Sequence, residues 1–124
     1  MKYKMTKREN PQKRTEKKWY AAPVYNGKVT KTDISKELVS MSSLSRGEVA
    51  NVIENLLEII PKHLLTGKSI SLGELGTLHI SFSSKGTDDP EIFSADMVRS
   101  RKIIFTAGPE LRKKMADLSF EEVK

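Results

Sequence analysis

The chain has 124 residues, which predicts a single domain, and it is 37% hydrophobic and 31% charged. It has no cysteine, so disulfides and thiolate–metal sites are excluded, as suits a reducing cytoplasm. The net charge of +6 favours an acidic partner such as nucleic acid. Residues 1–32 hold ten Lys or Arg against two Glu, whereas the rest of the chain holds twelve against fourteen acids. All the excess positive charge therefore lies in the first quarter of the chain.

The beginning of the chain, "MKYKMTKREN", lacks the apolar core of a signal peptide. No apolar run reaches the ~18 residues of a membrane span, since glutamates interrupt the longest candidate, "VIENLLEII". We therefore expect a cytoplasmic protein that has no membrane partner.

Residues 1–28 are predicted to be a basic N-terminal extension. "KYKMT" and "KKWYAAPVY" are candidate strands, and the polar, turn-rich "RENPQKRTEKK" lies between them, which predicts a β-hairpin with a basic loop. The extension supplies cations that could contact phosphates, namely Lys7, Arg8, Lys13, Arg14, Lys17 and Lys18. Trp19 and Tyr20 could stack on bases, or could instead anchor the hairpin to the rest of the chain.

Two helices should follow. Thr30 with Asp33, and Ser45 with Glu48, have the spacing of a capping box. In this motif the side chain of each residue accepts a hydrogen bond from the backbone N–H of the other. After Ser45, apolar residues recur at three-and-four spacing as far as Leu64, which predicts a strongly amphipathic helix. Pro61 lies inside this helix and removes one hydrogen bond, so we expect a kink, or a break near Ile60.

Strands and a last helix complete the pattern. "KSISL" is a short candidate strand, "TLHISFS" alternates well, and "RSRKIIF" predicts a third strand. Between the last two, "DDPE" predicts a short helix over about residues 90–97, with Asp89 as its cap. Strict alternation along the third strand places Arg99 and Arg101 on one face and Lys102 on the other. Gly108 and Pro109 open the last helix.

The glycines of "SLGELGTLHISF" interrupt an alternating strand, which indicates that the backbone must bend there. This glycine turn, the opening helix pair "TKTDISKELVSMSSLSRGEVANVI" and the close "IIFTAGPELRKKM" resemble the bacterial histone-like HU/IHF family. The resemblance covers about residues 29–118 and looks like a divergent HU-like branch with an N-terminal extension. It implies an α+β, HU-like fold with two N-terminal helices, a bent three-stranded antiparallel sheet with a short arm, and a C-terminal helix.

The resemblance also implies an intertwined homodimer, with residues 29–124 as its DNA-binding domain. The implied function is that of a nucleoid-associated protein that binds double-stranded DNA with low sequence specificity and bends or condenses it. The glycines would let the sheet turn at its base, so a bulky residue there should damage folding before binding. The alternative is an HU-like fold used as a structural or protein-interaction module without strong DNA bending, which the acidic balance after residue 32 favours.

By this resemblance, the strand that faces DNA in the family contains Arg99, Arg101 and Lys102. Lys85 precedes the arm on the opposite strand. Arg46 stands beside the turn between the helices, where the family often carries a cation that contacts the DNA backbone. These five residues, with Lys13, Arg14, Lys17 and Lys18 of the extension, are the predicted DNA-binding residues. The last-helix cations Arg112, Lys113 and Lys114 either contact DNA or form a solvated face. Pro90 stands near the family's intercalating proline, but its acidic context suits a helix start better.

No enzymatic constellation is present in the sequence. His63 and His79 have no partner at metal-ligand spacing, no serine lies in a Gly-x-Ser-x-Gly motif, and no phosphate-binding glycine loop occurs. We therefore predict no catalytic residue, no metal, no cofactor and no small-molecule substrate.

Overall fold

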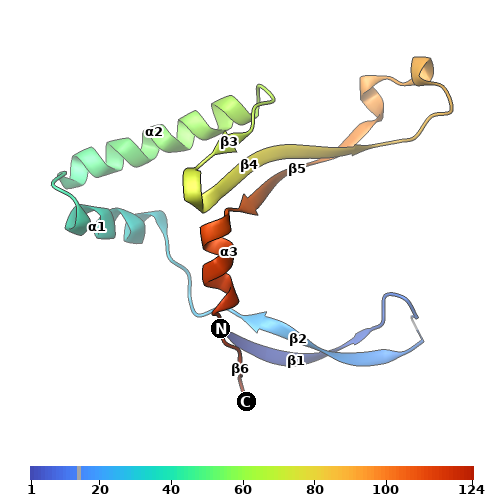
Figure 1. Cartoon of the computed structure of the whole chain (residues 1–124), viewed down its shortest axis with the longest axis horizontal. Coiled ribbons are helices and arrows are strands. Elements are labelled where there is room, and N and C mark those ends of the chain that lie inside the picture. Colours follow the sequence, from blue (N-terminus) through green and yellow to red (C-terminus); the bar gives the residue numbers. More distant parts are fainter. Residues whose placement is uncertain (14) are drawn as a thin grey trace.

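The computed structural model describes residues 1–13 and 15–124, and these form two three-stranded sheets and three α-helices (Figure 1). The first sheet has the order β2-β1-β6, from β1 (Lys2–Glu9), β2 (Lys17–Val24) and β6 (Glu121–Glu122). The second has the order β3-β4-β5, from β3 (Ile70–Ser71), β4 (Gly76–Ser84) and β5 (Val98–Ala107). The helices are α1 (Lys31–Met41), α2 (Arg46–Leu64) and α3 (Pro109–Ala116). The predicted α+β class is confirmed.

Two long hairpins, β1–β2 and β4–β5, leave the body of the molecule on the same side (Figure 1). Helix α3 runs between their bases, and α1 and α2 lie on the opposite side. None of the described helices is long and apolar enough to cross a membrane.

The two ends of the chain meet in one sheet, which the sequence did not predict. Strand β6 pairs in parallel with the start of β1, with Glu121 beside Lys2. The amino group of Met1 donates to the carbonyl of Ser119 at 2.7 Å, and the N–H of Val123 donates to the carbonyl of Tyr3 at 2.8 Å. The C-terminal tail therefore holds the base of the N-terminal hairpin.

Both predicted capping boxes are present. Thr30 caps α1 and exchanges hydrogen bonds with Asp33, and Ser45 caps α2 in the same way with Glu48. The backbone N–H and the hydroxyl of Thr30 donate to the Asp33 carboxylate and lower its pKa below the usual value. The hydroxyl and the backbone N–H of Ser45 likewise lower the pKa of Glu48. Each helix thus starts where local hydrogen bonding satisfies its first N–H groups.

Of the two outcomes expected at Pro61, the break near Ile60 does not occur, because α2 continues through Pro61 as far as Leu64. The kink stays a prediction. Proline lacks the N–H that would bond to the Leu57 carbonyl, but only that one hydrogen bond is lost so close to the helix end. The helix turn after the proline is intact, since the N–H of Leu65 donates to the Pro61 carbonyl at 2.9 Å. Leu64, only 3% exposed, anchors this last turn in the core.

The glycine turn forms a tight corner between β3 and β4. Gly73 to Leu75 make one 3-10 turn, and both Gly73 and Gly76 have positive φ angles, of 62° and 149°. The N–H of Gly108 donates to the Leu75 carbonyl at 2.9 Å, so the start of α3 closes on the same corner. The bend that the glycines predicted is therefore structural: it joins β3, β4 and α3.

The core of one chain is small. Val49 and Leu64 are the only described hydrophobic residues that are fully buried. Much of the apolar side of α2 remains open, as the half-exposed Val52, Leu56 and Leu57 show. An isolated chain therefore leaves apolar surface on both its helices and its sheet.

Candidate nucleic-acid interface

The pairing of β4 with β5 sorts their side chains onto two faces, because residues directly opposite in an antiparallel pair share a face. Thr77 pairs with Thr106, His79 with Ile104, Ser81 with Lys102 and Ser83 with Arg99. We call this set the polar face. The other face, here the apolar face, carries Leu78, Ile80, Phe82, Val98, Ile103 and Phe105. Neither strand contains an acidic residue.

The register contains an irregularity that changes which cations lie together. Between the Ser81–Lys102 and Ser83–Arg99 pairs, Ser100 and Arg101 together oppose Phe82. Ser100 has a φ of 58°, the left-handed conformation of an extra residue in a β-bulge. The prediction that Arg99 and Arg101 share a face is therefore wrong, since the bulge brings Arg99 onto the face of Lys102.

Arg101 lies on the other face of β5. It precedes Lys102 along β5, so alternation turns it toward the apolar face. That face is open in the single chain, with Phe82 61% exposed and Ile103 62% exposed. Arg101 therefore lies at the outer part of a hydrophobic surface, apart from the other two strand cations.

The tip of the arm is compact and acidic. Residues 85–97 fold into two 3-10 turns, Pro90–Ile92 and Ala95–Met97, where the sequence predicted a single short helix. The cap and the first position are as predicted: the Asp89 carboxylate accepts from the N–H of Glu91 at 3.0 Å, and Pro90 begins the turn. Asp88, Asp89, Glu91 and Asp96 all belong to this tip, and Lys85 stands at its base.

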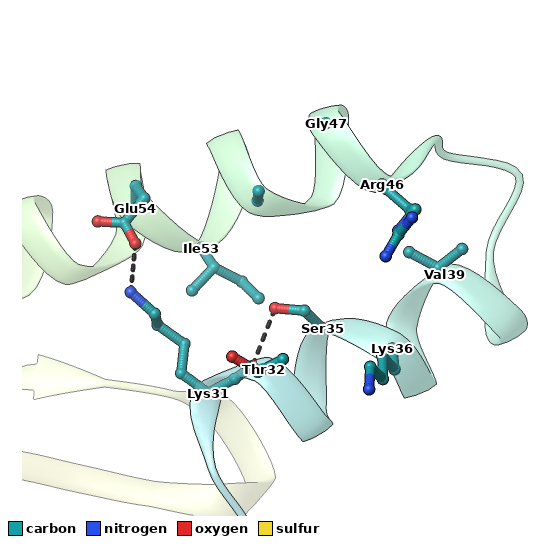
Figure 2. A pocket seen from close by; sticks show the side chains of 10 residues that line it. Lys31, Thr32, Ser35, Lys36, Val39, Arg46, Gly47, Ile53 and Glu54 are labelled. Atoms are coloured by element: carbon teal, nitrogen blue, oxygen red, sulfur yellow. Dashed lines mark hydrogen bonds and ion pairs between the residues drawn. The ribbon is translucent and has the colours of Figure 1, made fainter.

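Arg46 lies at the mouth of a groove of about 650 Å³ between α1 and α2 (Figure 2). Lys31 and Lys36 also line this groove, and Lys31 forms an ion pair with Glu54 across it. Among the described residues, Arg46 and Lys36 form no ion pair. The fold therefore keeps Arg46 exposed at the first position of α2, distant in sequence from the strand cations.

The cations of α3 form a solvated cluster. Lys113 pairs with Glu110 one turn earlier at 3.7 Å, and Arg112 and Lys114 are exposed.

The predicted cations of the extension lie on the β1–β2 hairpin. Lys17 and Lys18 fall on opposite faces of β2, across from Glu9 and Arg8 respectively. Lys13 lies in the connecting loop, and Arg14 lies outside the described residues. Sequence reasoning overlooked Lys4, which shares a face with Arg8 and Lys18. The alternation of "KYKMTKRE" was the signal that could have found it.

The histidines show no site of their own. His79 is half-buried on the polar face, and His63 is half-buried near the end of α2. The described residues contain no group of three or more His, Asp or Glu side chains placed to hold a metal ion.

Comparison with known families shows to which family the chain belongs. The family model described as "HU domain fused to wHTH, Ig, or Glycine-rich motif" (HU-HIG) matches residues 1–122. The chain belongs to the HU-HIG family. The match places it among the HU/IHF-like DNA-binding proteins and confirms the resemblance seen in the glycine turn and the closing motif. Because the match begins at residue 1, it includes the hairpin, while the division of the chain at residue 28 stays a prediction.

Relatives support the same family. Integration host factor subunit alpha from two strains of Haemophilus influenzae (ATCC 51907 / DSM 11121 / KW20 / Rd, and 86-028NP) is 30% identical over 89 residues. This alignment covers 70% of the chain and 93% of each relative. The fold is similar to the crystal structure of a candidate bacterial DNA-binding protein from Bacteroides vulgatus ATCC 8482, with a TM-score of 0.59 and 20% identity. The match covers 98% of this chain and 48% of that one, so the chain spans about half of its length.

Proposed function

We propose that this HU-HIG protein is a nucleoid-associated, histone-like protein that binds double-stranded DNA with low sequence specificity. The observation that carries the proposal is the β4–β5 register, which gathers Arg99 and Lys102 with four hydroxyl side chains on one face. That face has no acid, and hydroxyls and cations are the groups that contact phosphates in protein–DNA complexes. Contacts of this kind position the protein without reading bases, so little sequence preference is expected.

The same register supports a homodimer. The apolar face exposes Phe82, Ile103 and Phe105, and α2 exposes a further apolar row, on a chain with only two fully buried hydrophobic residues among those described. Surfaces of this extent on a soluble protein mark an association site. A second copy would cover them with an identical apolar surface, and would turn two polar faces toward one duplex. Arg46 and Lys85 are proposed to contact phosphates at the flanks of such a dimer.

The arm tip gives weaker support for bending. A bend by intercalation needs an apolar wedge at the minor groove, where the potential is negative. Here Pro90 stands between Asp89 and Glu91 in a tip with four carboxylates, and it begins a 3-10 turn capped by Asp89. We therefore expect Pro90 not to act as a wedge, and any bend to be small.

The acidic tip also supports a second candidate function, in which the same fold serves as a structural or protein-interaction module. Ile92 and Phe93 are exposed between the carboxylates, a mixture that suits a protein surface better than a phosphate backbone. In that case the dimer would form, but the polar face would not bind DNA appreciably.

Fluorescence anisotropy of a labelled duplex at several salt concentrations distinguishes the DNA-binding function from the interaction module. If DNA binding is electrostatic, the logarithm of the binding constant falls linearly with the logarithm of salt, by about 0.9 for each phosphate neutralised. Replacing both Arg99 and Lys102 by Gln should then lower that slope by about 2 for each arm engaged. A chain that is dimeric in light scattering but does not bind duplex at low salt would support the interaction module and overturn the DNA-binding proposal.

A further inference from the structure

The N-terminal hairpin, like the arm, separates its side chains by register. Lys4 pairs with Ala22, Thr6 with Tyr20 and Arg8 with Lys18, so these six residues share one face. We call the part of it formed by Lys4, Arg8, Lys18 and Tyr20 the basic face. Across the β1–β2 pair this side of the hairpin carries no acidic residue, whereas the other side carries Glu9 directly opposite Lys17.

The opposite side of the hairpin has a different chemistry. Tyr3, Met5, Trp19, Ala21 and Pro23 lie there, with Lys7 beside Trp19. The ammonium of Lys7 stands 6.0 Å from the centre of the Trp19 ring, at the limit of a cation–π contact. The two sides of the strand pair therefore differ in charge: one carries Lys4, Arg8 and Lys18 without an acid, whereas on the other Glu9 opposes Lys17.

The basic face is also preorganised. The guanidinium of Arg8 lies over the Tyr20 ring, 4.9 Å from its centre, and Tyr20 is half-buried. A side chain held in place before binding loses less conformational entropy when it meets its partner. Arg8 keeps its N–H donors for a planar, two-oxygen contact, and among the described residues Lys4, Arg8 and Lys18 form no ion pair.

The basic face ends near the base of the hairpin. Lys2 continues the same face, but Glu121 of β6 lies beside it, so its charge is locally opposed. On β1 the remaining cations reach from Lys4 to Arg8, four residue steps or about 13 Å of extended strand. That length corresponds to about four phosphates along one strand of duplex DNA.

We propose that the basic face is a second DNA-contacting surface, which binds the phosphate backbone of the same duplex that the β4–β5 arm binds. The proposal rests on the proposed function and adds to it a partner for the hairpin. Charge complementarity selects the partner, because the face offers three unpaired cations and no acid. Figure 1 shows both hairpins leaving the same side of the molecule, as two surfaces that engage one ligand must. The pairing of β6 with β1 holds the hairpin in this direction.

The test compares two double variants of the whole chain that change the charge equally. Lys4→Gln with Lys18→Gln removes one cation from each strand on the basic face. Lys7→Gln with Lys17→Gln removes one cation from each strand on the opposite face. Anisotropy with a labelled duplex is measured between about 50 and 200 mM salt. Circular dichroism reports whether each variant remains folded, because replacing Lys7 beside Trp19 would alter the fluorescence of this tryptophan directly.

The basic-face variant should lower the slope of log binding constant against log salt by about 1.8 for each hairpin engaged. The opposite-face variant should show only the long-range part of the charge effect, less than half of that change. Equal changes in the two variants would overturn the assignment to one face, and no change in either would show that the hairpin does not contact DNA. These results differ from failure of the proposed function, in which the unmodified chain itself would not bind. Selective binding to anionic vesicles, with unchanged duplex binding by the basic-face variant, would point to a membrane surface and also overturn the proposal.

Discussion

Gly76 gives the sharpest prediction about the fold. It is buried, its φ is 149°, and a Cβ built there would lie 2.3 Å from the Thr106 carbonyl oxygen and 2.8 Å from the Phe105 ring. A backbone conformation open essentially to glycine costs another residue on the order of 1–3 kcal/mol. Forcing a methyl group against backbone in a packed site costs about 1–3 kcal/mol more. Gly76→Ala should therefore lower the free energy of unfolding by about 2–6 kcal/mol.

Gly73 is the matched control, three residues away in the same corner. Its φ of 62° is also left-handed, but a Cβ there meets nothing within 4 Å. Gly73→Ala should cost only the left-handed strain, about 1–2 kcal/mol. Both variants are compared with the unmodified chain by urea denaturation followed by circular dichroism. All samples need the same protein concentration, because a dimer's stability depends on it. Equal losses in the two variants, or a larger loss at Gly73, would refute the argument from the close approach of Thr106.

Three further predictions concern the caps and the apolar face. Ser45→Ala should destabilise the protein by about 0.5–2 kcal/mol in urea denaturation, because the α2 cap is lost. The pKa values of Asp33 and Glu48 are lowered by folding, so their stabilising effect is present above their unfolded pKa values, near 4, and is lost as the pH falls through the folded ones. The melting temperature should therefore decrease as the pH falls below about 4, and the decrease should be smaller in Glu48→Gln. Ile103→Lys should convert the proposed dimer to a 14.0 kDa species in light scattering, and an unchanged dimer mass would contradict the proposed interface.

The features predicted well from the sequence are those encoded by neighbouring residues. The starts of α1 and α2 follow from Thr30 and Ser45, because a capping box is complete within one helical turn. The corner at Gly73 and Gly76 was equally local, since the positive φ angles needed there favour glycine. In these cases the residue type and its spacing contain the whole physical reason.

The errors came from effects beyond one helical turn. The break near Ile60, one of the two outcomes expected from Pro61, did not occur because burial of Leu64 supports the turn that follows the proline, and burial is a property of the fold. The bulge at Ser100 was not predicted because serine, unlike glycine, gives no signal of a left-handed backbone. Because the bulge adds one residue to β5, Arg99 lies on the same face as Lys102. The pairing of β6 with β1 joins opposite ends of the chain, and no local pattern reports it.

The charge of a segment is consequently a poor guide to its partner, while the charge of a face is a good one. Residues 33–124 contain more acids than cations, which favoured an interaction module. The fold places four of those acids at the arm tip and none on β4 or β5, so the polar face is positive although its segment is not. The hairpin shows the same principle, since Lys17 and Lys18 are adjacent in sequence and face opposite sides. Because exposed charges act mainly within about 8 Å in physiological salt, the face decides what binds.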